Sequence, residues 1–189
     1  IDSFPLGITS AGALLVYLDQ THHTELSNIC SISRIDEGSF VWMDRFTFRN
    51  LEIFASTAGK EGTSLIEVMD KCSSPMGARM LRNWLAMPVM DLQELEDRYS
   101  VVQCFVDSQD DLSRLQAMIG DIGDLERIIS RAAAGKIVPR EVMQLRRGLG
   151  QTKPITDLCR RQGIAALDDM ISRMGDCAEL LDYLGRTMH

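Results

Sequence analysis

The chain has 189 residues, 45% of them hydrophobic and 25% charged, so it can form a hydrophobic core in one domain, with or without a short neighbouring domain. The net charge of −7 argues against a nucleic-acid module that is basic throughout, and no apolar run approaches the roughly 20 residues of a membrane span. The five cysteines are scattered, odd in number and without a C-x-x-C pair, which predicts the reducing cytoplasm.

Two elements are predicted before residue 45. A helix over 7–21 carries Leu14, Leu15 and Leu18 on one stripe. The segment 39–44, with the sequence SFVWMD, is the best candidate for a strand because aromatic and β-branched residues favour a pleated surface. Its apolar side chains occupy both faces, so we expect the strand to be covered on both sides.

Local capping signals then predict a series of helices. Asp44 is a good N-cap, Thr63 or Ser64 precedes a short helix, and Asp91 is followed three residues later by Glu94. The stretch 56–64 has the composition of a loop. The helices predicted from these signals cover 45–54, 65–72 and 91–107, the last with an apolar stripe of Leu92, Leu95, Tyr99, Val102 and Val106. Another helix is announced by Ser74 and Pro75 and ended by Met87-Pro88.

The helix that starts at Pro75 raises a question of purpose. Met76, Met80 and Trp84 recur at every fourth position, with Leu81 and Leu85 beside them, and this spacing predicts a stripe that faces the core. Gly77 has no Cβ atom, so we expect another backbone to approach the helix there.

The rest of the chain reads as helices divided by glycine and proline. No convincing strand follows residue 44, and no fixed-period repeat indicates a solenoid. The sequence therefore predicts a mainly α, multi-helical fold with a short strand element near residues 39–44. The further helices are predicted at 110–119, 123–134, 139–149, 154–162, 165–174 and 176–187.

Candidate sites for chemistry are weak. His22 and His23 are adjacent, so on a helix they cannot face one metal ion together. The sequence AGKEGTS resembles part of a phosphate loop, but Lys60 is followed by Glu61 instead of a hydroxyl residue. No Ser or Cys stands in a nucleophile motif. We therefore predict no catalytic, cofactor-binding or metal-binding residues and no enzymatic activity for this chain.

Residues 120–163 are locally basic. Nine Lys and Arg against five Asp and Glu give +4 there, and the total of −7 leaves −11 elsewhere. No aromatic residue lies between 106 and 182, so base stacking is not available. Local ion pairs of Arg127 and Arg131 with Asp124 and Glu126 explain some of the charge. A weak contact with DNA or with another domain remains an interpretation for Arg131, Arg140, Arg146 and Arg147.

The stretch 64–91 resembles the signature region of the MutS family of DNA mismatch repair proteins. It has the sequence SLIEVMDKCSSPMGARMLRNWLAMPVMD. Met69 and Ser74 stand where the family often has Leu and Thr. The residues that match the family pattern are Pro75, Met76, Gly77, Arg79, Leu81, Trp84, Leu85 and Pro88.

The resemblance continues through most of the chain in the order of the family. Residues 10–21 are similar to its helix leaving the connector domain, and 40–54 are similar to its strand and Asp-x-x-T-x-R-N-L-E motif. Residues 122–149 resemble its D-L-E-R-I-x-x-R…P-R-D-L block, with Glu141 for the commoner Asp. The further matching residues are Asp44, Asn50, Leu51, Asp124, Leu125, Glu126 and Arg127.

This resemblance implies a division of the chain and a role for it. Residues 1–23 would be the tail of the connector domain, and 24–189 the N-terminal half of the helical core, or lever, ending before the clamp insertion. The segment would couple the ATPase domain of a dimeric parent to its mismatch-reading and clamp domains. ATP, Mg²⁺, mismatched double-stranded DNA, a second subunit and a MutL-type partner would belong to the parent. A self-standing helical adaptor that binds other proteins is the alternative.

Overall fold

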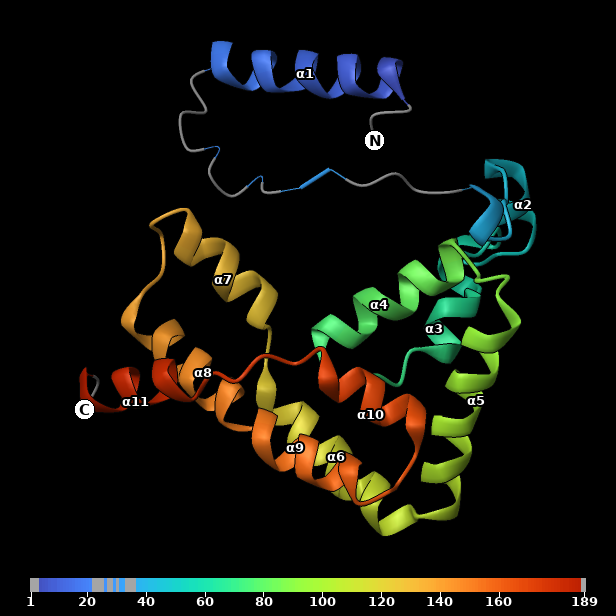
Figure 1. Cartoon of the computed structure of the whole chain (residues 1–189). Coiled ribbons are helices and arrows are strands. Elements are labelled where there is room, and N and C mark those ends of the chain that lie inside the picture. Colours follow the sequence, from blue (N-terminus) through green and yellow to red (C-terminus); the bar gives the residue numbers. More distant parts are fainter. Residues whose placement is uncertain (1–3, 22–25, 27–28, 30, 33–36, 188–189) are drawn as a thin grey trace.

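The structure is a computed structural model that describes residues 4–21, 26, 29, 31–32 and 37–187. It confirms the mainly α, multi-helical fold, since the described residues form eleven α-helices and two short 3₁₀ helices, η1 (Glu37–Ser39) and η2 (Gly59–Glu61). The α-helices, labelled in Figure 1, are α1 (Pro5–Gln20), α2 (Arg45–Asn50), α3 (Leu65–Met69), α4 (Pro75–Ala86), α5 (Leu92–Asp107), α6 (Gln109–Ile122), α7 (Leu125–Ala133), α8 (Pro139–Gly150), α9 (Thr152–Arg160), α10 (Ala165–Ser172) and α11 (Ala178–Thr187).

The predicted helix starts are confirmed by their N-cap hydrogen bonds. The carboxylate of Asp44 accepts from the backbone N–H of Thr47 at 2.7 Å, and that of Asp91 accepts from Glu94 at 2.8 Å. Ser74 and Pro75 together begin α4, with the Ser74 hydroxyl accepting from the N–H of Gly77. Each of these bonds satisfies a donor that the first turn of a helix leaves without a partner.

Helix α2 ends at Asn50, four residues earlier than predicted. Glu52 follows with a φ of 50°, a left-handed conformation that cannot continue a helix. The carbonyls of Glu52 and Ile53 then accept from the N–H groups of Leu65 and Ile66 at 2.9 and 3.0 Å. The chain therefore turns back onto the start of α3, where Glu67 accepts from the N–H and hydroxyl of Ser64.

The predicted strand over 39–44 is reduced to a single antiparallel bridge between Phe40 and Val89. Only one bridge forms because Asp44 begins α2 at once and the partner segment fills the short gap between α4 and α5. Trp42 is 74% exposed, so the expectation that the strand is covered on both sides was wrong.

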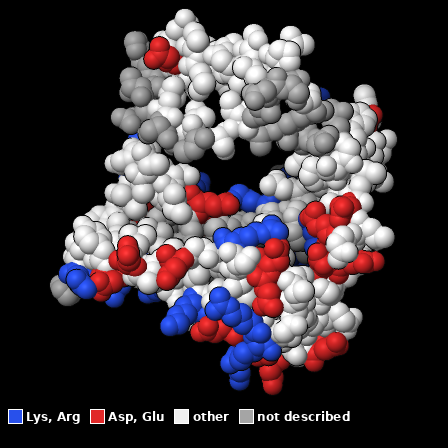
Figure 2. Space-filling model, in the orientation of Figure 1, with Lys and Arg blue, Asp and Glu red and all other residues white. Residues whose placement is uncertain are grey.

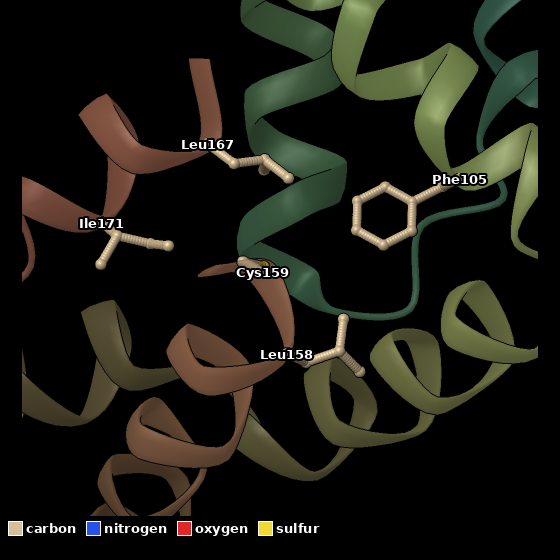
Figure 3. Close-up of a cluster of buried hydrophobic side chains, with 5 residues drawn as sticks. All are labelled: Phe105, Leu158, Cys159, Leu167 and Ile171. Atoms are coloured by element: carbon tan, nitrogen blue, oxygen red, sulfur yellow. The ribbon is translucent and has the colours of Figure 1, made fainter. Parts of the chain in front are cut away.

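Helices α5, α6, α9 and α10 form a closed ring of contacts around the main core. The buried cluster in Figure 3 comes from three of them, and α6 adds partly buried leucines and a methionine. Burying each large apolar side chain contributes on the order of 1.5–3 kcal/mol, so this ring carries much of the stability. The cluster consists of Phe105, Leu158, Cys159, Leu167 and Ile171.

The face of α5 that enters this core differs from the predicted stripe. Phe105 is buried and Val101 packs beside it, because that side of α5 faces α6 and α10. The predicted core residues Leu92, Tyr99 and Val102 are between 60% and 69% exposed. Helix α5 thus has two apolar faces, and the described residues bury only one of them.

A neutral amide ties three helices together beside the core. The Nε2 group of Gln162 donates to Asp111 on α6 at 2.9 Å and to the Leu158 carbonyl on α9 at 3.4 Å. Its Oε1 atom accepts from the thiol of Cys104 on α5 at 3.3 Å. One side chain therefore links α5, α6 and α9 beside the core.

Helix α1 has no fully buried side chain, and of its predicted stripe Leu14 and Leu15 are exposed while Leu18 is half-buried. The boundary predicted near residue 23 lies outside the described residues, so the division at that point stays a prediction. Among the described helices, none combines the length and apolar character that a membrane span requires.

Candidate functional site: the Arg79 junction and the basic face of α8

The two blocks of signature residues meet at Arg79. Its guanidinium donates to both carboxylate oxygens of Asp124, at 2.6 and 3.0 Å, and to Glu126 through Nε at 2.9 Å. Arg79 lies on α4, whereas Asp124 and Glu126 lie at the start of α7. A planar guanidinium that bonds two carboxylates fixes direction as well as distance, so this contact orients α4 relative to α7.

Asp124 has two roles in this junction. Besides accepting from Arg79, its carboxylate caps α7 by accepting from the backbone N–H of Arg127 at 3.3 Å. The side chain of Asp124 is 18% exposed and that of Arg79 is 45% exposed, so water screens the pair only in part. The hydrogen bonds from Arg79 hold the pKa of Asp124 below its ordinary value, and the same bonds raise the pKa of Arg79.

This pairing corrects one expectation. The sequence spacing predicted that Asp124 and Glu126 pair locally with Arg127 and Arg131, but Arg79 on α4 takes both carboxylates. Arg131 instead bonds Glu141 at 2.8 Å, across the connection from α7 to α8. The sequence missed both partners because neither lies at a helical i, i+4 spacing.

The signature residues of α4 lie on a half-open face. Met76, Leu81 and Leu85 are half-buried, whereas Met80 is 55% exposed and Trp84 is 41% exposed. The predicted core-facing stripe is thus only partly covered by the described residues. The Trp84 ring carries the Arg98 guanidinium at 3.7 Å from its centroid.

Gly77 does not admit another helix backbone, contrary to expectation. A Cβ atom at Gly77 would lie 3.3 Å from the hydroxyl of Ser74 and 3.4 Å from Cβ of Cys72, both in the segment just before it. Its small size therefore serves the cap of α4 itself.

The close approach belongs to Gly148 on α8. A Cβ atom there would lie 2.4 Å from the Ile122 carbonyl oxygen and 2.8 Å from Cδ2 of Leu125. The end of α6 and the start of α7 therefore pack directly on the α8 backbone, and the signature residue Leu125 takes part in this contact. The sequence predicts an ordinary helix over 139–149, because a lone glycine near a helix end does not indicate its tertiary neighbour.

The remaining signature residues serve local structure. Asp44 caps α2, and Thr57 holds the Glu52 carboxylate that follows the Asn50-Leu51 helix end. Leu51 is 59% exposed, and the Pro88 carbonyl accepts from the N–H of Val41 beside the bridge. The bond from Thr57 holds the pKa of Glu52 below its ordinary value.

Three of the four candidate basic residues gather on α8. Arg140, Arg146 and Arg147 line a depression of about 660 Å³ between α8 and the end of α6. Arg131 lies outside this depression and forms an ion pair with Glu141. His22, His23 and His189 lie outside the described residues, and the described ones hold no cluster of three or more His, Cys, Asp or Glu suited to a metal ion.

The sequence of the chain is similar to those of known proteins. The family model for MutS domain III matches residues 46–186. The chain is 41% identical over 189 residues to the DNA mismatch repair protein MutS of Parabacteroides distasonis, and 44% identical over 188 residues to that of Christiangramia forsetii. Each match covers 100% of the chain and 22% of the relative, so the chain spans about a fifth of the length of these proteins.

Proposed function

The chain belongs to the MutS family, as a segment that includes its domain III, and we propose that it is a helical element coupling distant parts of a mismatch repair protein. In this proposal the segment performs no catalysis. It passes rigid-body displacements between an ATP-hydrolysing domain and the domains that hold DNA.

One observation carries the proposal, namely the junction between Arg79 and Asp124. Helix α4 shares few contacts with the ring of α5, α6, α9 and α10, and the guanidinium fork fastens it to the start of α7. Helix α7 packs on α8, which in turn packs on α6 and α9. A displacement of α4 would therefore reach the core through defined bonds, because tightly packed helices move as bodies.

The dimensions suit such a role. Helix α5 has 16 residues and is about 24 Å long at 1.5 Å per residue. It joins the α4 end of the molecule to the ring of packed helices. A stiff helix of this length moves its far end whenever its near end rotates.

The parent's other properties follow from family membership as proposals. We propose that the parent binds ATP and Mg²⁺, acts on mismatched double-stranded DNA as a dimer, and meets a MutL-type partner in the cytoplasm. The exposed apolar face of α5, with Tyr99 at 67% exposure, favours the alternative of a protein-binding adaptor.

The coupling proposal is tested in the full-length parent with Arg79→Ala. We expect ATP hydrolysis without DNA to be unchanged and its response to mismatched DNA to fall several-fold. Arg173→Ala is the control, because among the described carboxylates Arg173 pairs only with Asp169, one turn away on an exposed surface. An unchanged response in Arg79→Ala, or an equal loss in both variants, would contradict coupling through this junction.

A further inference from the structure

The depression on α8 is lined by an uncompensated group of arginines. Arg140, Gln144 and Arg147 recur at i, i+4 and i+7, so they share one face of the helix. Arg146 adds a third guanidinium, and Asp121 is the one acid in the lining. The small residues Gly120 and Gly123 form the opposite wall at the end of α6.

These arginines have no described carboxylate partner and lie around one hollow. Six described arginines have a carboxylate within 4 Å, and no described carboxylate lies within that distance of the other nine, of which Arg140, Arg146 and Arg147 line the depression. Figure 2 shows acidic and basic side chains beside one another over parts of one face of the molecule. Three guanidinium groups around one hollow, with one acid in its lining, attract an anion.

Part of the group is held in place by the fold. Arg146 is half-buried, and its Nη2 atom lies 3.5 Å from the position of a Cβ atom on Gly185 of α11. The amide of Gln144 lies over Gly123, whose φ of 74° and lack of a side chain leave room for it. A donor set that is already oriented loses less entropy when it binds.

The residue types that line the depression indicate which kind of anion would bind there. Met143 is its one large apolar residue, and no aromatic residue lies between 106 and 182. A protein partner would normally find aromatic anchors, and a single strand would find stacking platforms. Arg140 and Arg147 are seven residues apart, or about 10 Å along the helix, so they can contact different phosphates of one strand.

We propose that Arg140, Arg146 and Arg147 form a contact surface for the phosphate backbone of double-stranded DNA, independent of base sequence. The choice of DNA rests on the proposed function, since a mismatch repair protein works beside a duplex. The surface would hold the duplex weakly, with equal affinity for matched and mismatched sites.

The test measures binding of the 189-residue chain to a labelled, fully paired duplex of about 30 base pairs by fluorescence anisotropy, between about 50 and 200 mM salt. In Arg140→Ala/Arg147→Ala the slope of log K against log salt should become shallower by about 1.8, or 0.9 for each lost phosphate contact. Arg160→Ala/Arg161→Ala at the C-terminal end of α9 removes the same charge from exposed positions and should leave the slope unchanged. Both double variants should keep the melting temperature of the unaltered 189-residue chain.

Three results would overturn the proposal. The first is no salt-dependent binding by the unaltered chain, and the second is an equal loss of slope in the two double variants. The third is binding of polyglutamate but not of duplex with the same dependence on Arg140 and Arg147, which would indicate an acidic protein partner. None of these results touches the Arg79 coupling experiment, so the two proposals fail separately.

Discussion

Arg79 and Asp124 are joined by two hydrogen bonds although 45 residues separate them in the sequence. The same carboxylate caps α7, so the junction between α4 and α7 and the first turn of α7 share one side chain. Because one carboxylate forms both the ion pair and the cap, a substitution of Asp124 can remove the charge alone or the charge together with the cap.

We expect Asp124→Asn to destabilise the chain less than Asp124→Ala. Asparagine is as good an N-cap as aspartate but cannot form the ion pair, whereas alanine loses both. The difference between the two variants should be about 1 kcal/mol in the free energy of unfolding, the usual worth of a cap. Urea denaturation at neutral pH measures it, and equal destabilisation by Asn and Ala would show that the cap contributes nothing.

Acid should weaken the junction. The folded pKa of Asp124 lies below its unfolded value because Arg79 bonds the charged form, so its contribution to stability is present above about pH 4 and is lost as pH falls through the folded pKa. Denaturation curves between neutral pH and about pH 3 should therefore show a smaller acid loss for Arg79→Gln than for the unaltered chain. The pKa values of Asp44, Glu52 and Glu67 are also lowered, and these groups give the same background in both proteins. Parallel pH curves would disprove the assignment to Arg79.

Gly148→Ala should be costly. The added methyl would lie 2.4 Å from the Ile122 carbonyl oxygen, so α6 and α8 must separate, at a cost of about 1–3 kcal/mol. Gly150→Ala on the same helix is the control, since a methyl there meets no atom within 4 Å. Alanine favours a helix over glycine by up to about 1 kcal/mol, so the control should be neutral or stabilising. Guanidinium denaturation compares the two, and equal effects would refute the close approach at Gly148.

The two faces of α5 and the core beneath one of them can be told apart by truncation. Leu158 is 2% exposed and belongs to the cluster in Figure 3, so Leu158→Ala should cost about 2–5 kcal/mol. Val106 on the open face is 53% exposed, so Val106→Ala should change stability by no more than about 0.5 kcal/mol. Thermal unfolding of both variants checks the assignment, and a large loss from Val106→Ala would show that the open face is covered.

Local signals account for what the sequence predicted well. Asp44, Ser74 and Asp91 cap their helices through bonds that reach three residues along the chain, and such bonds depend on nothing distant. The resemblance of the signature blocks likewise identified the family before any fold was known.

Distant partners account for what the sequence could not predict. Helix α5 has apolar residues on two faces, and only the positions of α6 and α10 decide that Phe105 is buried and Tyr99 exposed. Gly148 and Gly77 are both single glycines in a helical pattern, and the sequence does not show that the Ile122 carbonyl lies against Gly148. The fork of Arg79 depends on how the chain returns after 45 residues, which no helical spacing encodes.

The amide of Gln162 makes the rim of the core sensitive to the position of single atoms. Its nitrogen faces the carboxylate of Asp111 on α6, and its oxygen faces the thiol of Cys104 on α5. A half-turn of the amide would place its oxygen beside the Asp111 carboxylate, so two acceptors would face each other. A glutamate in its place would bring two negative groups together at a site that borders buried hydrocarbon. The hydrogen bonds among α5, α6 and α9 therefore form only when the amide nitrogen points toward α6 and the amide oxygen points toward α5.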